Sequence, residues 1–321
     1  MPLRYAYNTN GCANHRLADA LDLIAVAGYD GVALTLDWHH LDPLAPDWRA
    51  RCDELRGRLG RLGLASVIET GARFLLDPRR KHEPTLVSAS PDGRARRVAF
   101  LKRAVDIQVA LGAETVSCWA GVRGAGVGAD EARGYLREGL AEVLDHAAAV
   151  GGEVSLEPEP GMAVETNADY RALVGALGAR GDGLRLALDL GHVWVTGETF
   201  PGVGATDLAP AAAVHRFADR LGAVAIEGMD RGVHVHRPLD AGDMPIPPLL
   251  AALRDVGYRR LVSVELSRES PRAHEAIPAS LAHLRRAEAA PAPPRAAYPP
   301  IPLPPSPPCV SSSSPAATSP P

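Results

Sequence analysis

Three short apolar segments in the second half of the chain each end on a carboxylate or a histidine. Glu157 ends EVSLEPEP, Asp189 and His192 end RLALDLGH, and Glu265 ends LVSVELS. Apolar runs of four or five residues that stop at a polar group are typical of buried strands. In a barrel of parallel strands the carboxyl ends converge on one face, which carries the active site. We therefore expect these four side chains to meet around one point.

The residue types at these strand ends suit a divalent metal ion. Hard carboxylate oxygens together with one or two imidazoles bind Mn²⁺, Mg²⁺, Co²⁺ or Zn²⁺. A lone strand-end carboxylate is often only a helix cap or a loop charge, but such endings on three strands are more specific. The sequence therefore predicts that Glu157, Asp189 and Glu265 form a metal or acid–base site.

A further apolar segment, AVAIEG, precedes a stretch that carries two histidines. A fourth ligand is expected near the end of this strand, where the sequence has Ala225. The nearby candidates for that ligand are Glu227, His234 and His236. The two histidines alternate, so in an extended segment they point the same way. Solvated loop histidines are the alternative, but a histidine pair beside carboxylates favours contact with metal or substrate.

The segment from residue 68 to residue 88 combines a strand-end acid with a cluster of cations. Glu69 ends the strand, and the cations are Arg73, Arg79, Arg80, Lys81 and His82. Cations over a barrel mouth suit a phosphate or carboxylate of the substrate. A solvated basic loop is the alternative. We take Glu69, Arg73, Lys81 and His82 as candidate substrate-binding residues.

The segment TLDWHHL places an aromatic ring and two imidazoles at the end of an earlier strand. Trp38, His39 and His40 follow Asp37 directly. These residue types fit stacking on a sugar ring and hydrogen bonding to its hydroxyls, although a packed loop would look the same. We take His39 and His40 as candidate substrate-binding residues.

Strand-like and helix-like segments alternate along most of the chain. The expected strands are 3–8, 31–37, 65–70, 114–120, 153–158, 185–190, 223–228 and 261–266. The expected helices lie near 15–27, 47–62, 94–111, 130–150, 168–179, 208–220, 246–256 and 271–288. Several helices are expected to stop at glycine, at Gly28, Gly63, Gly112, Gly151 and Gly257. Eight strands, each followed by a helix, predict a (β/α)₈ TIM barrel in one domain, residues 1–288. A doubly wound open sheet is the alternative, and the absence of a G-x-G-x-x-G turn after the first strand disfavours it.

Composition narrows the class of protein further. The formal charge of the 321 residues is −4, which implies no general attraction to nucleic acid or membranes. The longest apolar stretches are far shorter than a membrane span, and the N-terminal segment has no apolar signal core.

The four cysteines, Cys12, Cys52, Cys118 and Cys309, show no C-x-x-C spacing and are expected to be reduced thiols of a cytoplasmic protein. Residues 289–321 contain 13 prolines and one charged residue, so we expect a disordered tail.

The quoted motifs resemble the xylose isomerase-like TIM-barrel superfamily of sugar phosphate isomerases and epimerases. The resemblance covers about residues 3–288 and rests on Glu157, the D-L-G-H block with Asp189 and His192, and the run HVHRPLDAGDMPI. That run is similar to the family's H-x-P-L-G-x-G-x-I-D segment, and GYRRLVSVELS is similar to its last strand with the terminal Glu265.

The resemblance implies a divalent metal held by two glutamates, an aspartate and a histidine of the seventh strand. By position these are Glu157, Asp189 and Glu265, and the two glutamates also act as base and acid on opposite faces of the substrate carbon. His192 matches a substrate-binding histidine. The seventh-strand histidine falls at Ala225, and Asp240 and Asp243 depart from the family's glycine spacing.

Three functions agree with these features. The first is a metal-assisted isomerase or epimerase of a small sugar, cyclitol or sugar phosphate. The second is a lyase or dehydratase on the same barrel, and the third is a non-catalytic metabolite-binding barrel with a degenerate metal site, for which Ala225 is the best support. A DNA-repair endonuclease fits poorly, because it needs more histidine ligands and a basic face. The expected partner is a small polar, in part anionic, substrate, with no nucleic acid and no membrane; a homo-oligomer is compatible with the sequence.

Overall fold

The chain folds into a closed barrel of eight parallel strands. The computed structural model describes residues 2–200 and 209–290. The strands follow the order β1-β10-β7-β6-β5-β4-β3-β2, and β2 closes the barrel on β1. Their bounds are β1 Arg4–Asn8, β2 Gly31–Thr35, β3 Ala65–Glu69, β4 Val116–Trp119, β5 Val154–Glu157, β6 Leu184–Asp189, β7 Leu221–Ile226 and β10 Leu261–Val264. The TIM-barrel prediction is confirmed, and all eight expected strands are present.

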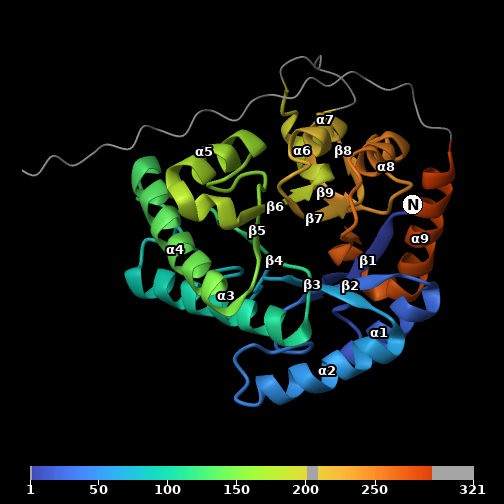
Figure 1. Cartoon of the computed structure of the whole chain (residues 1–321), viewed down its shortest axis with the longest axis horizontal. Coiled ribbons are helices and arrows are strands. Elements are labelled where there is room, and N and C mark those ends of the chain that lie inside the picture. The colour runs from blue at the N-terminus through green and yellow to red at the C-terminus, as the bar shows by residue number, and fades with distance from the viewer. Residues whose placement is uncertain (1, 201–208, 291–321) are drawn as a thin grey trace, which may run out of the picture.

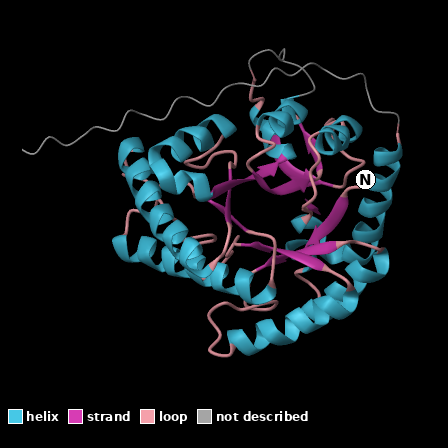
Figure 2. Cartoon of the chain, in the orientation of Figure 1, coloured by secondary structure: helices cyan, strands magenta, loops and turns pink. Residues whose placement is uncertain are grey.

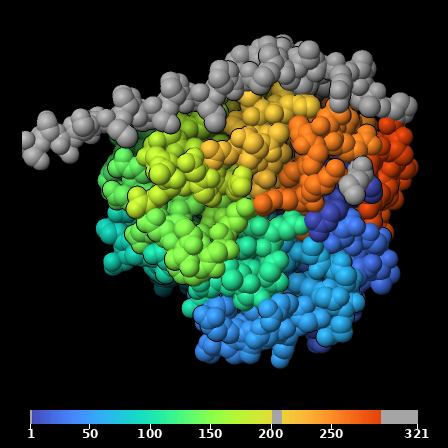
Figure 3. Space-filling model, in the orientation of Figure 1, coloured from blue at the N-terminus to red at the C-terminus, as the bar shows by residue number. Residues whose placement is uncertain are grey.

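Helices surround the barrel on all sides in Figure 1, and the strands lie at the centre in Figure 2. The helices are α1 Leu17–Ala27, α2 Trp48–Leu62, α3 Pro91–Leu111, α4 Ala129–Val150, α5 Asn167–Leu177, α6 Leu190–Thr196, α7 Ala209–Arg216, α8 Ile246–Asp255 and α9 Ala273–Ala289. In the space-filling view the colours follow one another in chain order around the visible face (Figure 3). Four expected glycine stops, Gly28, Gly63, Gly112 and Gly151, are left-handed C-caps.

Small apolar side chains fill the middle of the barrel interior. Ala6, Ala33, Val67, Ala187 and Ala223 belong to one buried cluster that is separate from the larger core between strands and helices. Alternate residues of a strand face the same side. The next inward positions toward the carboxyl ends are Asn8, Thr35, Glu69, Asp189 and Ala225. On four of these five strands, the side chains inside the barrel therefore change from apolar to polar within two residues.

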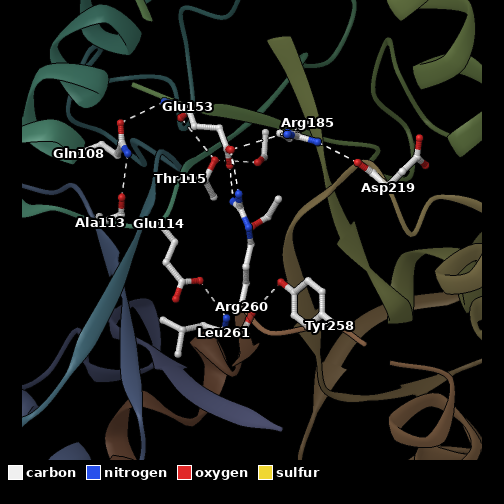
Figure 4. A network of polar contacts seen from close by, with 12 residues as sticks. Gln108, Ala113, Glu114, Thr115, Glu153, Arg185, Asp219, Tyr258, Arg260 and Leu261 are labelled. Atoms are coloured by element: carbon white, nitrogen blue, oxygen red, sulfur yellow. Dashed lines mark hydrogen bonds and ion pairs between the residues drawn. The ribbon is translucent and has the colours of Figure 1, made fainter. Parts of the chain in front are cut away.

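A network of charged side chains ties the strands together at the opposite, amino-terminal end of the barrel (Figure 4). Arg260 pairs with both carboxylate oxygens of Glu153, and its Nη2–Oε2 distance is 2.9 Å. Arg260 also donates to the Gly222 carbonyl, at 3.2 Å. Glu114 accepts from Arg4 Nη1 at 2.6 Å and from the Leu261 amide at 3.0 Å. These contacts join residues next to β1, β4, β5, β7 and β10, so they stabilise barrel closure away from the site.

The structure adds elements that the sequence analysis did not predict. Helix α6 follows β6 directly, and the strands β8 Gly228–Asp230 and β9 Val233–Arg237 form an antiparallel hairpin after β7. Helix α9 ends at Ala289, one residue beyond the expected domain boundary. Cys12, Cys52 and Cys118 are buried free thiols, whereas Cys309 and almost all of the expected tail lie outside the described residues. None of the helices α1–α9 combines the length and apolar character that crossing a bilayer requires.

Candidate metal centre and barrel mouth

Glu157, Asp189 and His192 bring three donor atoms together at the carboxyl end of the barrel. The donor atoms all lie within 4.8 Å of one another, and all three residues are buried. Glu157 and Asp189 are the last residues of β5 and β6, and His192 stands in the first turn of α6. Asp189 Oδ1 accepts the His192 amide at 2.9 Å, so the carboxylate caps α6. The D-L-G-H block thus fixes an aspartate and a histidine in one compact turn.

The β8–β9 hairpin carries two further imidazoles to this cluster. His234 and His236 lie on the same side of β9, as their alternation predicted, and the Nε2 atoms of His234 and His192 are 3.0 Å apart. The Nδ1 atom of His192 lies 3.1 Å from the Pro158 carbonyl, so this nitrogen carries the proton. The Nε2 atom of His192 therefore keeps its lone pair for a ligand.

Glu227 extends the cluster beyond Ala225. Ala225 pairs with Asp189 in the β6–β7 ladder and offers no donor beside it. Glu227 lies two residues further and is fully buried. Asp189, Glu227 and His236 form a second donor triad, and His192, His234 and His236 form a third, each with donor atoms within 4.8 Å. Two of the three predicted candidates for a further ligand, Glu227 and His236, therefore lie next to Asp189, and His234 lies next to His192 and His236.

Unpartnered oxygens show that the cluster suits a cation. Asp189 Oδ2 and both carboxylate oxygens of Glu227 are buried, and when both carboxyls are ionised no side chain among the described residues donates to them. Buried carboxylate oxygens are normally paired, because desolvation is costly. A divalent ion bound between oxygen and imidazole donors would satisfy these atoms. The residues present therefore fit a divalent metal.

Burial and mutual repulsion control the charge of the cluster in the absence of an ion. Burial and neighbouring carboxylates raise the pKa of Glu157 and of Glu227 well above the usual value. Burial opposes ionisation of Asp189 as well, but His192 and His236 outweigh it and lower the pKa of that carboxyl. Burial lowers the pKa of His192 to about 4, so its imidazole is neutral near pH 7, as a metal ligand must be.

A cavity of about 540 Å³ opens above this cluster. Glu157, His192, His234, His236 and Glu265 line it, which places Glu265 over the same space as Glu157. Asn10 Nδ2 donates to Glu265 Oε1 at 2.8 Å and orients that carboxylate. Glu265 is not part of the three donor triads, so the structure brings it to the cavity without placing it within the tightest donor group.

The candidate residues of the third loop also face the cavity. Glu69, Arg73, Lys81 and His82 line it together with Glu159. Burial and the nearby Glu265 raise the pKa of Glu69 to about 8, and the same two causes raise that of Glu159 to about 8. His82 Nδ1 bonds the Gly71 carbonyl at 2.6 Å, which holds the loop against the mouth. The mouth therefore combines protonatable acids with cations.

His39 and His40 lie beside this cavity rather than in its lining. His40 Nε2 bonds the His15 carbonyl at 3.1 Å within the surrounding loops. His39 lines a separate groove with Trp38, and its ring contacts that of His40 at a tilt of 39°, with centroids 4.1 Å apart. The structure therefore separates these two histidines from the carboxylate cluster.

Asn10, Glu159 and Trp119 are among the cavity residues that sequence reasoning missed. Glu159 stands two residues after Glu157, a spacing that points to the same face and could have indicated it. Trp119 ends β4, and the buried Arg97 supports it, with the guanidinium 4.2 Å from the ring centroid. Arg97 in turn donates to the Thr70 carbonyl at 3.0 Å. This support arises from tertiary packing of α3, which no local pattern predicts.

Comparisons with known proteins agree with this architecture. The chain matches the family model described as xylose isomerase-like TIM barrel over residues 21–287. No curated protein matches the chain. Similar solved structures include an IOLI protein with a bound zinc atom, with a TM-score of 0.69 and 18% identity over 89% of this chain and 98% of that chain.

Two epimerase structures are similar to the chain over comparable lengths. One is D-allulose 3-epimerase from Methylomonas sp., with a TM-score of 0.64 and 20% identity over 89% of this chain and 98% of that chain. The other is 3-keto-D-glucoside 4-epimerase from E. coli, with a TM-score of 0.67 and 17% identity over 88% of this chain and 99% of that chain. At these identities the structures show a shared fold, and the family match covers most of the sequence. The chain belongs to the xylose isomerase-like TIM-barrel family.

Proposed function

We propose that this protein is a metal-assisted isomerase or epimerase that moves a proton between two glutamates, Glu157 and Glu265. The observation that carries the proposal is that both carboxyls line one cavity beside the donor cluster. Strands β5 and β10 are three positions apart around the barrel. The two side chains therefore reach the cavity from different sides, as transfer across a substrate carbon requires.

The metal would be held by Glu157, Asp189 and His192, with Glu265 and one of Glu227, His234 and His236 to complete the set. Oxygen donors favour Mg²⁺ or Mn²⁺, and the imidazoles extend the range to Co²⁺ and Zn²⁺. When bound, a divalent ion polarises a substrate carbonyl and so acidifies the adjacent C–H bond. Glu227 is the ligand that best compensates for Ala225, because it is buried next to Asp189 and, when both carboxyls are ionised, no side chain among the described residues donates to its oxygens.

Glu157 and Glu265 carry out the proton transfer. One carboxylate removes the proton next to the carbonyl, and the other returns a proton to the opposite face or to the neighbouring carbon. A general acid or base works best when its pKa lies near the operating pH. Burial and the surrounding carboxylates shift Glu157 in that direction. Asn10 holds Glu265 in place through its amide.

The lining indicates a small, polar substrate with several hydroxyls. Glu69 and His82 offer hydrogen bonds, and Arg73 and Lys81 offer positive charge for a phosphate or carboxylate. The volume of the cavity agrees with that of a small-molecule site. These features support a sugar, a cyclitol or a sugar phosphate as the substrate class.

Metal analysis followed by a substrate screen tests this function. The purified protein should contain about one divalent ion per chain, and ketoses, inosose-like cyclitols and their phosphates should be tested with Mn²⁺, Mg²⁺, Co²⁺ and Zn²⁺. We expect conversion to a product of equal mass. A protein that binds none of these ions, or that binds carbohydrates without converting any, would instead support a non-catalytic barrel.

Glu159 favours a second candidate function, a lyase or dehydratase on the same site. This acid lines the cavity, and burial together with Glu265 keeps it protonated near neutral pH. A protonated carboxyl can donate to a departing hydroxyl after the same C–H bond has broken. Mass analysis separates the two functions, because dehydration lowers the mass of the product by one water and isomerisation leaves it unchanged.

A further inference from the structure

A second groove opens on the same end of the barrel, next to the reaction cavity. It has a volume of about 500 Å³ and is formed by the loops that follow the first three strands. His15 comes from the loop before α1, Asp37, Trp38 and His39 follow β2, and Arg73 and Phe74 follow β3. Its size is within the range of small-molecule sites.

Two exposed aromatic rings line this groove. Trp38 is 71% exposed and Phe74 is 53% exposed. Large aromatic side chains are costly to leave in water, and exposed apolar surface at a concave site marks a binding surface. A flat indole ring beside polar groups suits the apolar face of a sugar ring.

Unpaired polar atoms in the same lining point to a ligand with hydroxyls. Both ring nitrogens of His39 and the Nδ1 atom of His15 are buried and lack hydrogen-bond partners among the described residues. The nearest carboxylate oxygen, Asp37 Oδ2, is 3.9 Å from His39 Nδ1, too far for a hydrogen bond. Because such atoms are normally paired, the groove is missing hydrogen-bonding groups.

Arg73 connects the groove to the reaction cavity. Its side chain lines both spaces, and its Nη2 donates to the Asn10 carbonyl at 3.0 Å. Asn10 in turn holds Glu265. A molecule that occupies both spaces would therefore pass the Arg73 guanidinium, which Asn10 links to the carboxylate that we assign to proton transfer.

We propose that the groove binds a second sugar ring, so that the cavity and the groove together take a glycosylated keto-sugar more tightly than a free monosaccharide. The reacting ring lies in the reaction cavity, between Glu157 and Glu265. The second ring stacks on Trp38 and forms a hydrogen bond with His39. This inference rests on the proposed function for the reacting ring. A second copy of the chain covering Trp38 and Phe74 is the competing occupant, but a convex protein surface would leave the histidine nitrogens and the groove unfilled.

Binding measurements on the intact, metal-loaded protein test the inference. Isothermal titration calorimetry should compare D-fructose with four glucosyl-fructoses, namely turanose, maltulose, leucrose and palatinose, which differ in the position of the link. We expect at least one disaccharide to bind about tenfold more tightly than D-fructose, the gain that one good aromatic contact provides. Trp38→Ala should abolish this difference and leave the Kd of D-fructose unchanged.

Two controls define the outcome. Val26→Ala removes an apolar side chain that is 88% exposed on α1, away from the groove, and should change neither Kd. Phe74→Ala should weaken only the disaccharide. If no disaccharide binds better than D-fructose, or if Trp38→Ala changes the oligomeric state without changing any Kd, the inference is wrong even though D-fructose still reacts.

A probe without a carbonyl separates this inference from the proposed function. Methyl β-D-glucopyranoside cannot isomerise, so the part of its binding that is lost in Trp38→Ala reports on the groove independently of turnover. Saturation-transfer NMR should detect it on the wild-type protein and not on Trp38→Ala. No transfer to the wild-type protein would contradict the groove assignment, whether or not the barrel mouth turns over ketoses.

Discussion

The carboxylate of Glu227 occupies the space that any side chain at position 191 would need. An ideal Cβ on Gly191 would overlap Glu227 Oε1 and would also come within 2.6 Å of the terminal methyl of Met229. An alanine in the D-L-G-H turn would therefore force the ends of the buried Glu227, which directly follows β7, and of Met229 to shift, and the backbone angle of Gly191 is not the constraint. Two segments separated by more than thirty residues thus depend on each other at the donor cluster.

Gly191→Ala should push Glu227 out of place and weaken the site. We expect a loss of stability of about 1–3 kcal/mol, the usual cost of overpacking a buried position, and weaker binding of Mn²⁺ or Zn²⁺. Gly175→Ala is the matched control, because that helical glycine has open space around its Cβ position. The control should raise the melting temperature slightly, since alanine favours the helix. Thermal unfolding and metal titration of both variants check this; equal effects would show that Glu227 does not depend on Gly191.

Glu227→Gln should lower the affinity for a divalent ion without unfolding the protein. The substitution keeps the shape of the side chain but removes the negative charge that Glu227 would carry as a ligand beside Asp189 and His236. A loss of about tenfold or more is expected, because each ligand contributes at least one order of magnitude of affinity. Calorimetric titration of the metal-free protein measures it. An unchanged affinity would indicate that the imidazoles of β9 replace Ala225 without Glu227.

The metal-free protein should become less stable as the pH rises. Glu69 and Glu159 have a pKa of about 8 in the folded state, against an ordinary value near 4.3 when unfolded. The folded state therefore binds more protons than the unfolded state between these values. The stability from these protonated acids is fully present below about pH 4.3 and is lost as the pH rises through 8, by up to about 1.4 kcal/mol per pH unit for each group.

Melting temperatures at pH 6 and pH 9 test this dependence. The metal-free protein should melt lower at pH 9, and Glu69→Gln should reduce the difference. Saturating Mn²⁺ should also reduce it, since a bound cation stabilises the ionised carboxylates. A metal-free protein that is equally stable at both pH values would contradict the assignment of protonated acids to the mouth.

Arg260→Met should destabilise the fold while leaving the metal site unchanged. The variant leaves Glu153 without its main partner at the amino-terminal end of the barrel. Because both side chains are partly exposed, we expect a loss of only about 1–2 kcal/mol. Chemical unfolding and metal titration of the same variant check both halves. A fall in metal affinity would show that the two ends of the barrel are coupled.

Strand-end residues were predictable from the sequence because the barrel topology forces them together. Glu157, Asp189 and Glu265 each end an apolar run, and the parallel arrangement brings such ends to one face. Glu265 was also expected among the metal ligands, whereas the structure places it over the cavity, outside the tightest donor groups. That difference depends on side-chain reach, which a strand pattern does not encode.

The hairpin after β7 was harder to predict than the barrel. Its strands are short, and Gly232, with a φ of +71°, forms the tight turn between them. The alternation of His234 and His236 was the one local signal, and it gave their common direction correctly. For His40 the local signal did not give the position of the side chain. Its residue type fits sugar binding, but a hydrogen bond to the His15 carbonyl holds the ring among the surrounding loops. Contacts between different loops decide such placements.

Exchange of substrate hydrogen with solvent tests the central claim most directly. The protein should be incubated in D₂O with Mn²⁺ and the sugar that it converts, and deuterium at the carbon next to the carbonyl should be followed by NMR. Proton transfer through Glu157 and Glu265 predicts deuterium in the substrate or product, and predicts that Glu157→Gln and Glu265→Gln each abolish both exchange and turnover while the melting temperature stays within a few degrees. Turnover of the wild-type protein with no deuterium incorporation under any condition would contradict the account and would favour an internal hydride shift.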